Sequence, residues 1–251
     1  MIPEKTRAAI NLHAILRSLE DLCALDDDAK ALLAGHDLSI GMRVPGFDPL
    51  TLEVKGGCLK ARRGRAPGGL RLLFLSPGHF NGMVAGDRMP IPLGSPAQLR
   101  FLKNNFAALA KDLEKYLKPD KERLKDPAFL EKNTRLTAAA ALYAASEVAA
   151  ADPLGQKIAG AMGDGGILLE VPGKLAYTIR AQSGRLATLK GEQPPIHAFM
   201  RFESLEMLGQ VLRGEADSYL AIGRGAISIS GRIPMVDNLN KLLGLVSFYL
   251  A

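Results

Sequence analysis

The chain has 251 residues, of which 47% are hydrophobic and 23% are charged. This balance is typical of folded globular domains and excludes a disordered or fibrous protein, and the length suits one large or two ordinary domains. The formal net charge is +6, tryptophan is absent and aromatic residues make up 6%. Because few side chains could stack on nucleobases, we expect no nucleic-acid partner.

The first half of the chain predicts helices, then strands, then helices again. A helix is expected over residues 8–23, where leucines recur on one face. Ser76 is expected to cap a short helix that ends at Gly86, and a longer helix follows over residues 99–116. The strand candidates are Leu38–Val44, Thr51–Lys55, Cys58–Arg62 and Leu70–Leu75.

The second half predicts a similar set of elements after a charged segment. Residues 119–134 carry Pro119 and Pro127, so we expect a linker between one domain of residues 1–118 and another of residues 135–251. The strand candidates are Ile167–Val171, Leu175–Ala181, Arg185–Lys190, Ala198–Phe202 and Ala226–Ser230. A last helix is expected to bury one apolar stripe of Val236, Leu239, Leu243, Val246 and Leu250.

The two halves repeat one another at a fixed offset. Gly46 matches Gly173 (173 − 46 = 127), and Gly86 matches Gly214 (214 − 86 = 128), with turn and capping residues between them matched in the same way. A period this long predicts two copies of one domain rather than a solenoid. If Gly94 matches Gly231 (231 − 94 = 137), the first copy lacks about nine residues (137 − 128 = 9) and keeps at best an edge strand there.

The segment from Phe199 to Ala251 resembles the C-terminal half of a sterol carrier protein type 2 domain. The matching parts are a helix that ends at Leu212 to Gly214, a strand from Gly225 to Gly231, and a helix over Asn238 to Leu250. The resemblance implies an α/β (α+β) protein of two tandem domains, each with a mixed, mainly antiparallel five-stranded sheet covered by helices on one face. It is weaker over residues 8–117.

The same resemblance implies a hydrophobic cavity between the sheet and the helices. In the second copy its lining would be Phe202, Leu205, Leu208, Leu212, Tyr219, Ile222, Met235, Leu239, Leu243 and Val246. In the first copy it would be Phe74, Phe80, Met83, Val84, Leu102, Phe106 and Leu109. From residue types alone, these side chains would more often simply pack as a core.

Motifs for other chemistry do not occur in the sequence. There is no phosphate-binding glycine loop, no nucleophile elbow, and no histidine or cysteine spacing suited to a metal, so we expect neither a catalytic residue nor a metal or cofactor. Ser76 and His79 could be imagined as a nucleophile and its base. We interpret Ser76 instead as a helix cap and His79 as a solvent-facing side chain.

Location and membrane contact are suggested by the charged residues. The first helix carries Glu4 and Arg7 in place of a signal-peptide core, and no uncharged run reaches the roughly 18 residues that span a bilayer, so we expect a cytoplasmic protein. The densest basic segment is Lys55, Lys60, Arg62, Arg63 and Arg65. It is either a solvated face or a surface for transient contact with an anionic membrane.

The sequence leaves two functions open. The first is non-enzymatic binding or transfer of a fatty acyl, sterol-like or other long apolar molecule. The second is an accessory or scaffold module that binds proteins, for example in lipid or quinone metabolism, with filled cavities. The ligand, the packing of the two copies and the oligomeric state do not follow from the sequence.

Overall fold

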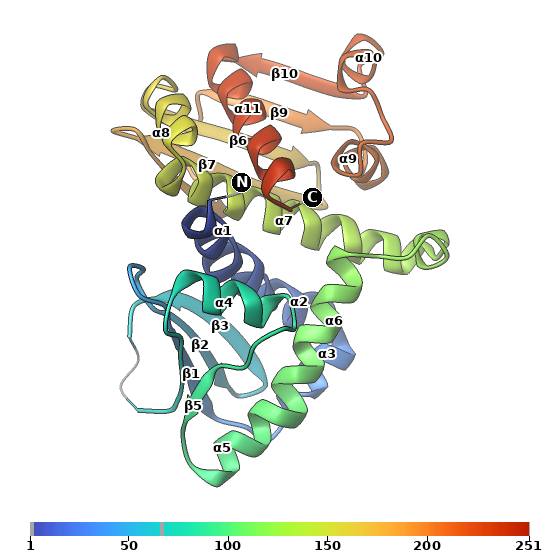
Figure 1. Ribbon diagram of the computed structural model, residues 1–251. Coiled ribbons are helices and arrows are strands. Elements are labelled where there is room, and N and C mark those ends of the chain that lie inside the picture. The colour runs from blue at the N-terminus through green and yellow to red at the C-terminus, as the bar shows by residue number, and fades with distance from the viewer. Residues whose placement is uncertain (1–2, 66–67, 251) are drawn as a thin grey trace. The chain divides into compact units, whose positions relative to one another are not determined.

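The computed structural model describes residues 3–65 and 68–250 (Figure 1). The chain divides into two compact units, Met1–Asp120 and Lys121–Ala251, which we call unit 1 and unit 2. Each contains one five-stranded mixed sheet with helices, as the sequence predicted. Helix α7 already begins at Pro127, within the segment expected to be a linker, and its Asn133 and Thr134 are buried.

Unit 1 begins with helices, continues with four strands, a helix and a fifth strand, and ends with helices. The helical elements are α1 (Glu4–Ile10), η1 (Asn11–Ile15), η2 (Leu16–Ser18), α2 (Leu19–Leu25), α3 (Asp27–Ala31), α4 (Pro77–Val84), α5 (Pro96–Phe101), η3 (Leu102–Phe106) and α6 (Ala107–Leu117). The strands are β1 (Leu38–Arg43), β2 (Leu50–Lys55), β3 (Cys58–Arg63), β4 (Leu70–Leu73) and β5 (Ile91–Leu93), in the order β3-β2-β1-β4-β5. The short β5 contains Pro92 and forms the edge, where a missing N–H costs little.

Unit 2 has the same order of elements with one additional helix. Its helical elements, after η4 (Arg123–Lys125), are α7 (Pro127–Ala151), α8 (Pro153–Gly160), α9 (Leu205–Leu212), α10 (Ser218–Gly223) and α11 (Ile233–Leu250). The strands are β6 (Gly165–Val171), β7 (Leu175–Gln182), β8 (Arg185–Lys190), β9 (Ala198–Phe202) and β10 (Ile227–Gly231), in the order β10-β9-β6-β7-β8. The additional helix is α10.

The two sheets agree in register as well as in strand order. In unit 1 the parallel pair β1–β4 sets Ile40 opposite Leu70, and in unit 2 the parallel pair β6–β9 sets Ile167 opposite Ala198. These positions differ by the two offsets read from the sequence (167 − 40 = 127 and 198 − 70 = 128). The edge pairs Leu72–Pro92 and Met200–Ile229 likewise differ by 128 and 137 (200 − 72 = 128 and 229 − 92 = 137).

A buried aspartate–tyrosine hydrogen bond recurs in both units. The Asp26 carboxylate accepts the N–H of Ala29 at the start of α3 and the hydroxyl of Tyr116 from α6, at 3.0 and 2.7 Å. In unit 2, Asp152 accepts the N–H of Gly155 and the hydroxyl of Tyr249, at 2.7 and 2.6 Å. Each carboxylate therefore caps a helix and also anchors the last helix of its unit.

The sheet turns also share polar contacts. The hydroxyl of Thr51 donates to the carbonyl of Gly64 at 2.7 Å, and the hydroxyl of Thr178 donates to that of Gly191 at 2.9 Å. Both threonines are buried. Because an unpaired buried hydroxyl is costly, these bonds fix the chain that follows β3 and β8 against the sheet.

Helix α11 buries a different stripe from the one expected. The buried residues are Met235, Val236, Leu239, Leu242, Val246 and Tyr249. Leu243 is half-buried and Leu250 is exposed, so the expected stripe is wrong at these two positions. The bond from Tyr249 to Asp152 explains the change of phase, because it turns that tyrosine inward.

His13 is a buried ionisable group in unit 1. It lies in the π-helical segment η1 and is 2% exposed. Its pKa is lowered from 6.5 to about 3, chiefly by burial and also by the charges of Arg63 and Arg17, while the backbone of Asp48 opposes the shift only in part. The imidazole is therefore neutral in the folded protein at any ordinary pH.

We predict an acid-dependent loss of stability from His13. Its pKa is lower in the folded state than in the unfolded state. Between about pH 6.5 and pH 3 the unfolded chain therefore binds the proton more readily, and the free energy of unfolding decreases as the pH decreases. Between pH 7.5 and pH 5.0 this contributes a loss of about 2 kcal/mol. Urea unfolding of His13→Leu should show a smaller loss than the wild type by that amount, and equal losses would contradict the assignment.

A second prediction concerns the anchor of α11. Tyr249→Phe leaves a buried oxygen of Asp152 without its hydroxyl donor and should lower the free energy of unfolding by about 2 kcal/mol. Tyr116→Phe should have a comparable effect in unit 1. Tyr219→Phe, at a tyrosine that is 84% exposed, is the matched control and should change little. If Tyr249→Phe is as mild as this control in urea unfolding, the bond does not anchor the helix.

Candidate functional site

One row of residues crosses the whole sheet of unit 2 on the face that the helices cover. Tyr177 of β7 packs edge-on against Tyr143 of α7, with ring centroids 6.1 Å apart, which identifies the covered face. The strand registers place Lys190, Tyr177, Leu169, Met200 and Ile229 directly opposite one another in this row. They therefore share the helix-covered face.

This row is buried in its middle and more open at both ends, at exposed Lys190 of β8 and at the β9 and β10 positions. Leu169 and Tyr177 are buried, whereas Met200 of β9 and Ile229 of β10 remain half-buried although α9 and α11 both pack on β9. Figure 1 shows α9 and α10 at one end of strands β9 and β10, whereas α11 begins at the opposite end of β10 and runs across the sheet. We call Met200 and Ile229 the apolar floor.

Helix α10, which precedes β10, presents apolar side chains to solvent. Asp217 caps the helix by accepting the N–H groups of Tyr219 and Leu220, at 2.8 and 3.2 Å. Ala221 is the only buried residue of this helix. Tyr219, Leu220 and Ile222 face solvent, with exposed fractions of 84%, 60% and 39%. We call these three residues the α10 apolar cluster.

The residues expected to line a cavity in unit 2 fall into three groups. Phe202, Leu208, Met235, Leu239 and Val246 are buried. Leu205, Leu212 and Leu243 are half-buried, and Tyr219 and Ile222 are exposed in the α10 apolar cluster. The structure thus places half of the expected lining in the packed core and the rest at or near the surface.

Unit 1 is more closed than unit 2 at the counterpart of Met200, although Pro92, the counterpart of Ile229, is exposed. Of its expected lining, Phe74, Phe80, Phe106 and Leu109 are buried, Met83 and Leu102 are half-buried, and Val84 is exposed. Leu72, the counterpart of Met200, is only 1% exposed. The described residues 85–90 between α4 and β5 contain no helix, so unit 1 has no counterpart of α10 there.

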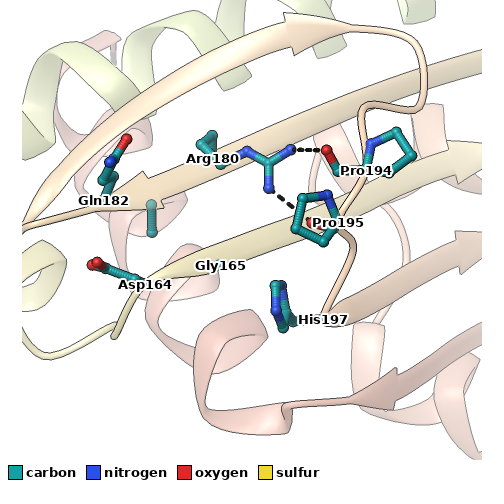
Figure 2. A pocket seen from close by; sticks show the side chains of 8 residues that line it. Asp164, Gly165, Arg180, Gln182, Pro194, Pro195 and His197 are labelled. Carbon is teal, nitrogen blue, oxygen red and sulfur yellow. Dashed lines mark hydrogen bonds between the residues drawn. The ribbon is translucent and has the colours of Figure 1, made fainter.

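A polar depression of about 550 Å³ lies elsewhere on unit 2 (Figure 2). Its lining is Asp164, Gly165, Arg180, Ala181, Gln182, Pro194, Pro195 and His197. The Arg180 guanidinium donates to the carbonyls of Pro195 at 2.8 Å, Pro194 at 3.1 Å and Gln193. This arginine therefore holds the loop after β8 against the sheet.

His197 closes one side of the depression. Its Nδ1 accepts the N–H of Gly166 at 3.1 Å, so in the neutral ring the proton is on Nε2. A side chain on Gly166 would collide with the carbonyl of Pro195, at 2.6 Å from its Cβ. We did not expect this site from the sequence, although Gly165-Gly166 and Pro194-Pro195 signal a close approach of two backbones.

His79 is bonded rather than solvent-facing. Its Nδ1 accepts the N–H of Leu75 at 3.1 Å, and its Nε2 donates to the carbonyl of Met89 at 2.8 Å. Ser76 accepts the backbone N–H of His79 at 3.1 Å as the expected helix cap. With both ring nitrogens committed to backbone groups, the imagined pairing of Ser76 with a His79 base does not form.

The expected basic residues do not share one surface. Lys60 and Arg62 point away from the helices, and Arg62 lies 3.4 Å from Glu53. Arg63 instead pairs with Leu50 in the row that the helices cover, and its charge lowers the pKa of buried His13. Lys55, on the open face, and Arg65, which follows β3, are both exposed.

Two further findings concern metals and membranes. Within residues 3–65 and 68–250, no group of three or more His, Cys, Asp or Glu side chains is arranged to hold a metal ion. No helix in the described part of the chain is long and apolar enough to cross a bilayer.

No protein-family model and no curated protein matches this sequence. Among solved structures, the UbiJ-SCP2 ubiquinone synthesis protein is similar over 39% of this chain and 79% of its own, with 16% identity and a TM-score of 0.32. The inverting sec-alkylsulfatase Pisa1 from Pseudomonas sp. is similar over 61% of this chain, with 14% identity and a TM-score of 0.28. This chain spans 30% of the length of that sulfatase.

Proposed function

We propose that unit 2 binds the hydrocarbon part of a lipid, or another long apolar molecule, without catalysing a reaction. The observation that carries the proposal is the apolar floor. Met200 of β9 and Ile229 of the edge strand β10 lie on the helix-covered face yet stay half-buried, while Leu169 and Tyr177 in the same row are buried. An apolar ligand would complete this burial.

The energetics of such binding are favourable without a polar anchor. Each methylene removed from water contributes about 0.8 kcal/mol, so ten of them contribute about 8 kcal/mol before the cost of immobilising the ligand. That gross value corresponds to about micromolar affinity. The α10 apolar cluster would extend the contact, because its three side chains now face water.

The same contacts favour α10 over α11 as the moving part of the site. Helix α11 buries six residues and is anchored through Tyr249 to Asp152. Helix α10 buries only Ala221. Because fewer buried contacts must break, displacement of α10 is the less costly way for a ligand to enter or leave.

We also propose that the two units are copies of one domain, of which unit 2 kept the ligand site. The shared registers and the repeated aspartate–tyrosine anchor support a duplication. Exchange of a lipid requires contact with a bilayer, and we propose that the basic strand region of unit 1 makes that contact.

The floor is tested with two neighbouring substitutions. Met200→Gln keeps the length of the side chain but sets an unpaired amide against the ligand, which should weaken the binding of cis-parinaric acid, a fluorescent fatty acid, about tenfold. Phe199→Gln is the matched control, since Phe199 is also half-buried but points to the opposite face of β9. Fluorescence titration gives both dissociation constants, and circular dichroism checks the fold.

The outcomes distinguish lipid binding from a scaffold. Equal weakening by both substitutions would show that the floor is not the site. If the wild type binds no probe, and mass spectrometry of its organic extract finds no lipid, the lipid-binding proposal fails and the module that binds only proteins is favoured.

A further inference from the structure

The sheet of unit 1 has one face that no helix covers within residues 3–65 and 68–120. Cross-strand pairs place Arg62, Thr51, Gly41, Arg71 and Leu93 in a single row over all five strands. The adjacent positions on these strands, such as Leu52 and Leu72, are buried on the helix side. Since successive residues of a strand alternate between faces, this row lies on the outer face.

The outer face is strongly basic. Its exposed cationic side chains are Arg43, Lys55, Lys60, Arg62 and Arg71, and the register adds one carboxylate, Glu53, opposite Lys60. Exposed Arg65 follows Gly64, whose carbonyl is bonded to Thr51 on this same face. We call Arg43, Lys55, Lys60, Arg62 and Arg71 the basic face.

Unit 2 shows that the fold does not require these charges. At the offsets of 127 and 128 that relate the two sheets, Arg43, Lys55, Lys60, Arg62 and Arg71 correspond to Glu170, Gln182, Ala187, Leu189 and Phe199. Not one of these counterparts is basic. The outer face of a sheet with this register therefore tolerates neutral and acidic residues, and the basic face must serve another purpose.

On the outer face of unit 2, charged side chains are paired with groups of the same unit. Arg180, the counterpart of Glu53, is bonded to three backbone carbonyls of the loop after β8. Glu170 is paired with Arg201 at 2.7 Å. On the basic face, by contrast, Glu53 is a single carboxylate among five cationic side chains.

Apolar side chains border the basic face along its β5 edge. Leu93 and Ile91 lie opposite Arg71 and Leu73, so they share the outer face, and they are about two-fifths exposed. Leu75 follows β4 and Met89 precedes β5, with exposed fractions of 74% and 82%.

His79 is hydrogen-bonded to the backbone of both Leu75 and Met89. It accepts the N–H of Leu75 and donates to the carbonyl of Met89, so one imidazole is bonded to both of these highly exposed apolar residues. We call Leu75, Met89, Ile91 and Leu93 the apolar rim. Large apolar groups held in water in this way are typical of an interaction surface.

We propose that the basic face and the apolar rim together dock on an anionic phospholipid bilayer. The cationic side chains would pair with lipid phosphates and carboxylates, and the rim would enter the boundary between headgroups and acyl chains. A nucleic acid fits less well, because the face carries no aromatic side chain on which bases could stack. This inference deepens the membrane contact proposed above and does not depend on the apolar floor.

The charge contribution is measured by co-sedimentation with vesicles of phosphatidylserine and phosphatidylcholine. Each cationic residue near such a surface contributes about fivefold in affinity, so Lys60→Gln/Arg62→Gln/Arg71→Gln should weaken binding on the order of a hundredfold. Lys118→Gln/Lys125→Gln/Lys241→Gln is the matched control, because it removes equal charge from exposed helical or loop positions outside the sheet. The control should retain most of the binding.

The contribution of the apolar rim to vesicle binding is measured separately. Leu75→Ser/Met89→Ser should weaken the binding that remains at high salt, where charge is screened, while leaving the salt-dependent part largely intact. His79→Ala should act in the same direction, because it releases both segments.

Three results would overturn the proposal. These are equal losses in the basic-face variant and its control, binding to pure phosphatidylcholine as tight as to anionic vesicles, or tighter binding to an RNA oligonucleotide than to vesicles. Binding of cis-parinaric acid by the basic-face variant tests the floor of unit 2 independently. Loss of vesicle binding with retained probe binding supports the docking surface, whereas retained vesicle binding without probe binding refutes only the lipid site.

Discussion

Helices cover only one face of each five-stranded sheet, and the rest of the structure depends on how the other face meets water. In both units a buried threonine hydroxyl, that of Thr51 or Thr178, holds the chain after the third strand on that face. In unit 2, Arg180 adds three hydrogen bonds to this chain, whereas in unit 1 the face carries exposed cationic side chains. Two sheets of the same register thus solve one constraint differently, and the difference marks where each unit has a surface to offer a partner.

The covered faces differ as well. The last helix of each unit is anchored by a tyrosine that donates to the aspartate capping an earlier helix. This anchor holds α11 over part of the sheet, while α9 and α10 lie at the far end of β9 and β10 (Figure 1). Met200 and Ile229 remain half-open between these helices. Unit 1 lacks the segment equivalent to α10 and buries Leu72 at the matching position.

These surfaces suggest a division of labour between the units. Unit 2 has the open apolar floor, which suits a hydrocarbon chain, and unit 1 has the basic face and apolar rim, which suit a membrane surface. His79 and the polar depression beside His197 both look reactive in isolation. Both ring nitrogens of His79 are hydrogen-bonded to backbone groups. At His197, Nδ1 accepts the N–H of Gly166. Both histidines are therefore explained by local structure.

The sequence by itself determined most of the strands, the helix cap at Ser76 and the offsets that relate the two halves, because these depend on local periodicity and turn residues. The tertiary structure decided which residues face outward. Helix α11 has leucines on several sides, so its phase depends on tertiary contacts such as the bond from Tyr249 to Asp152. Likewise, neighbours in sequence such as Arg62 and Arg63 lie on opposite faces of a strand, and the openness of Met200 depends on helices distant in the chain.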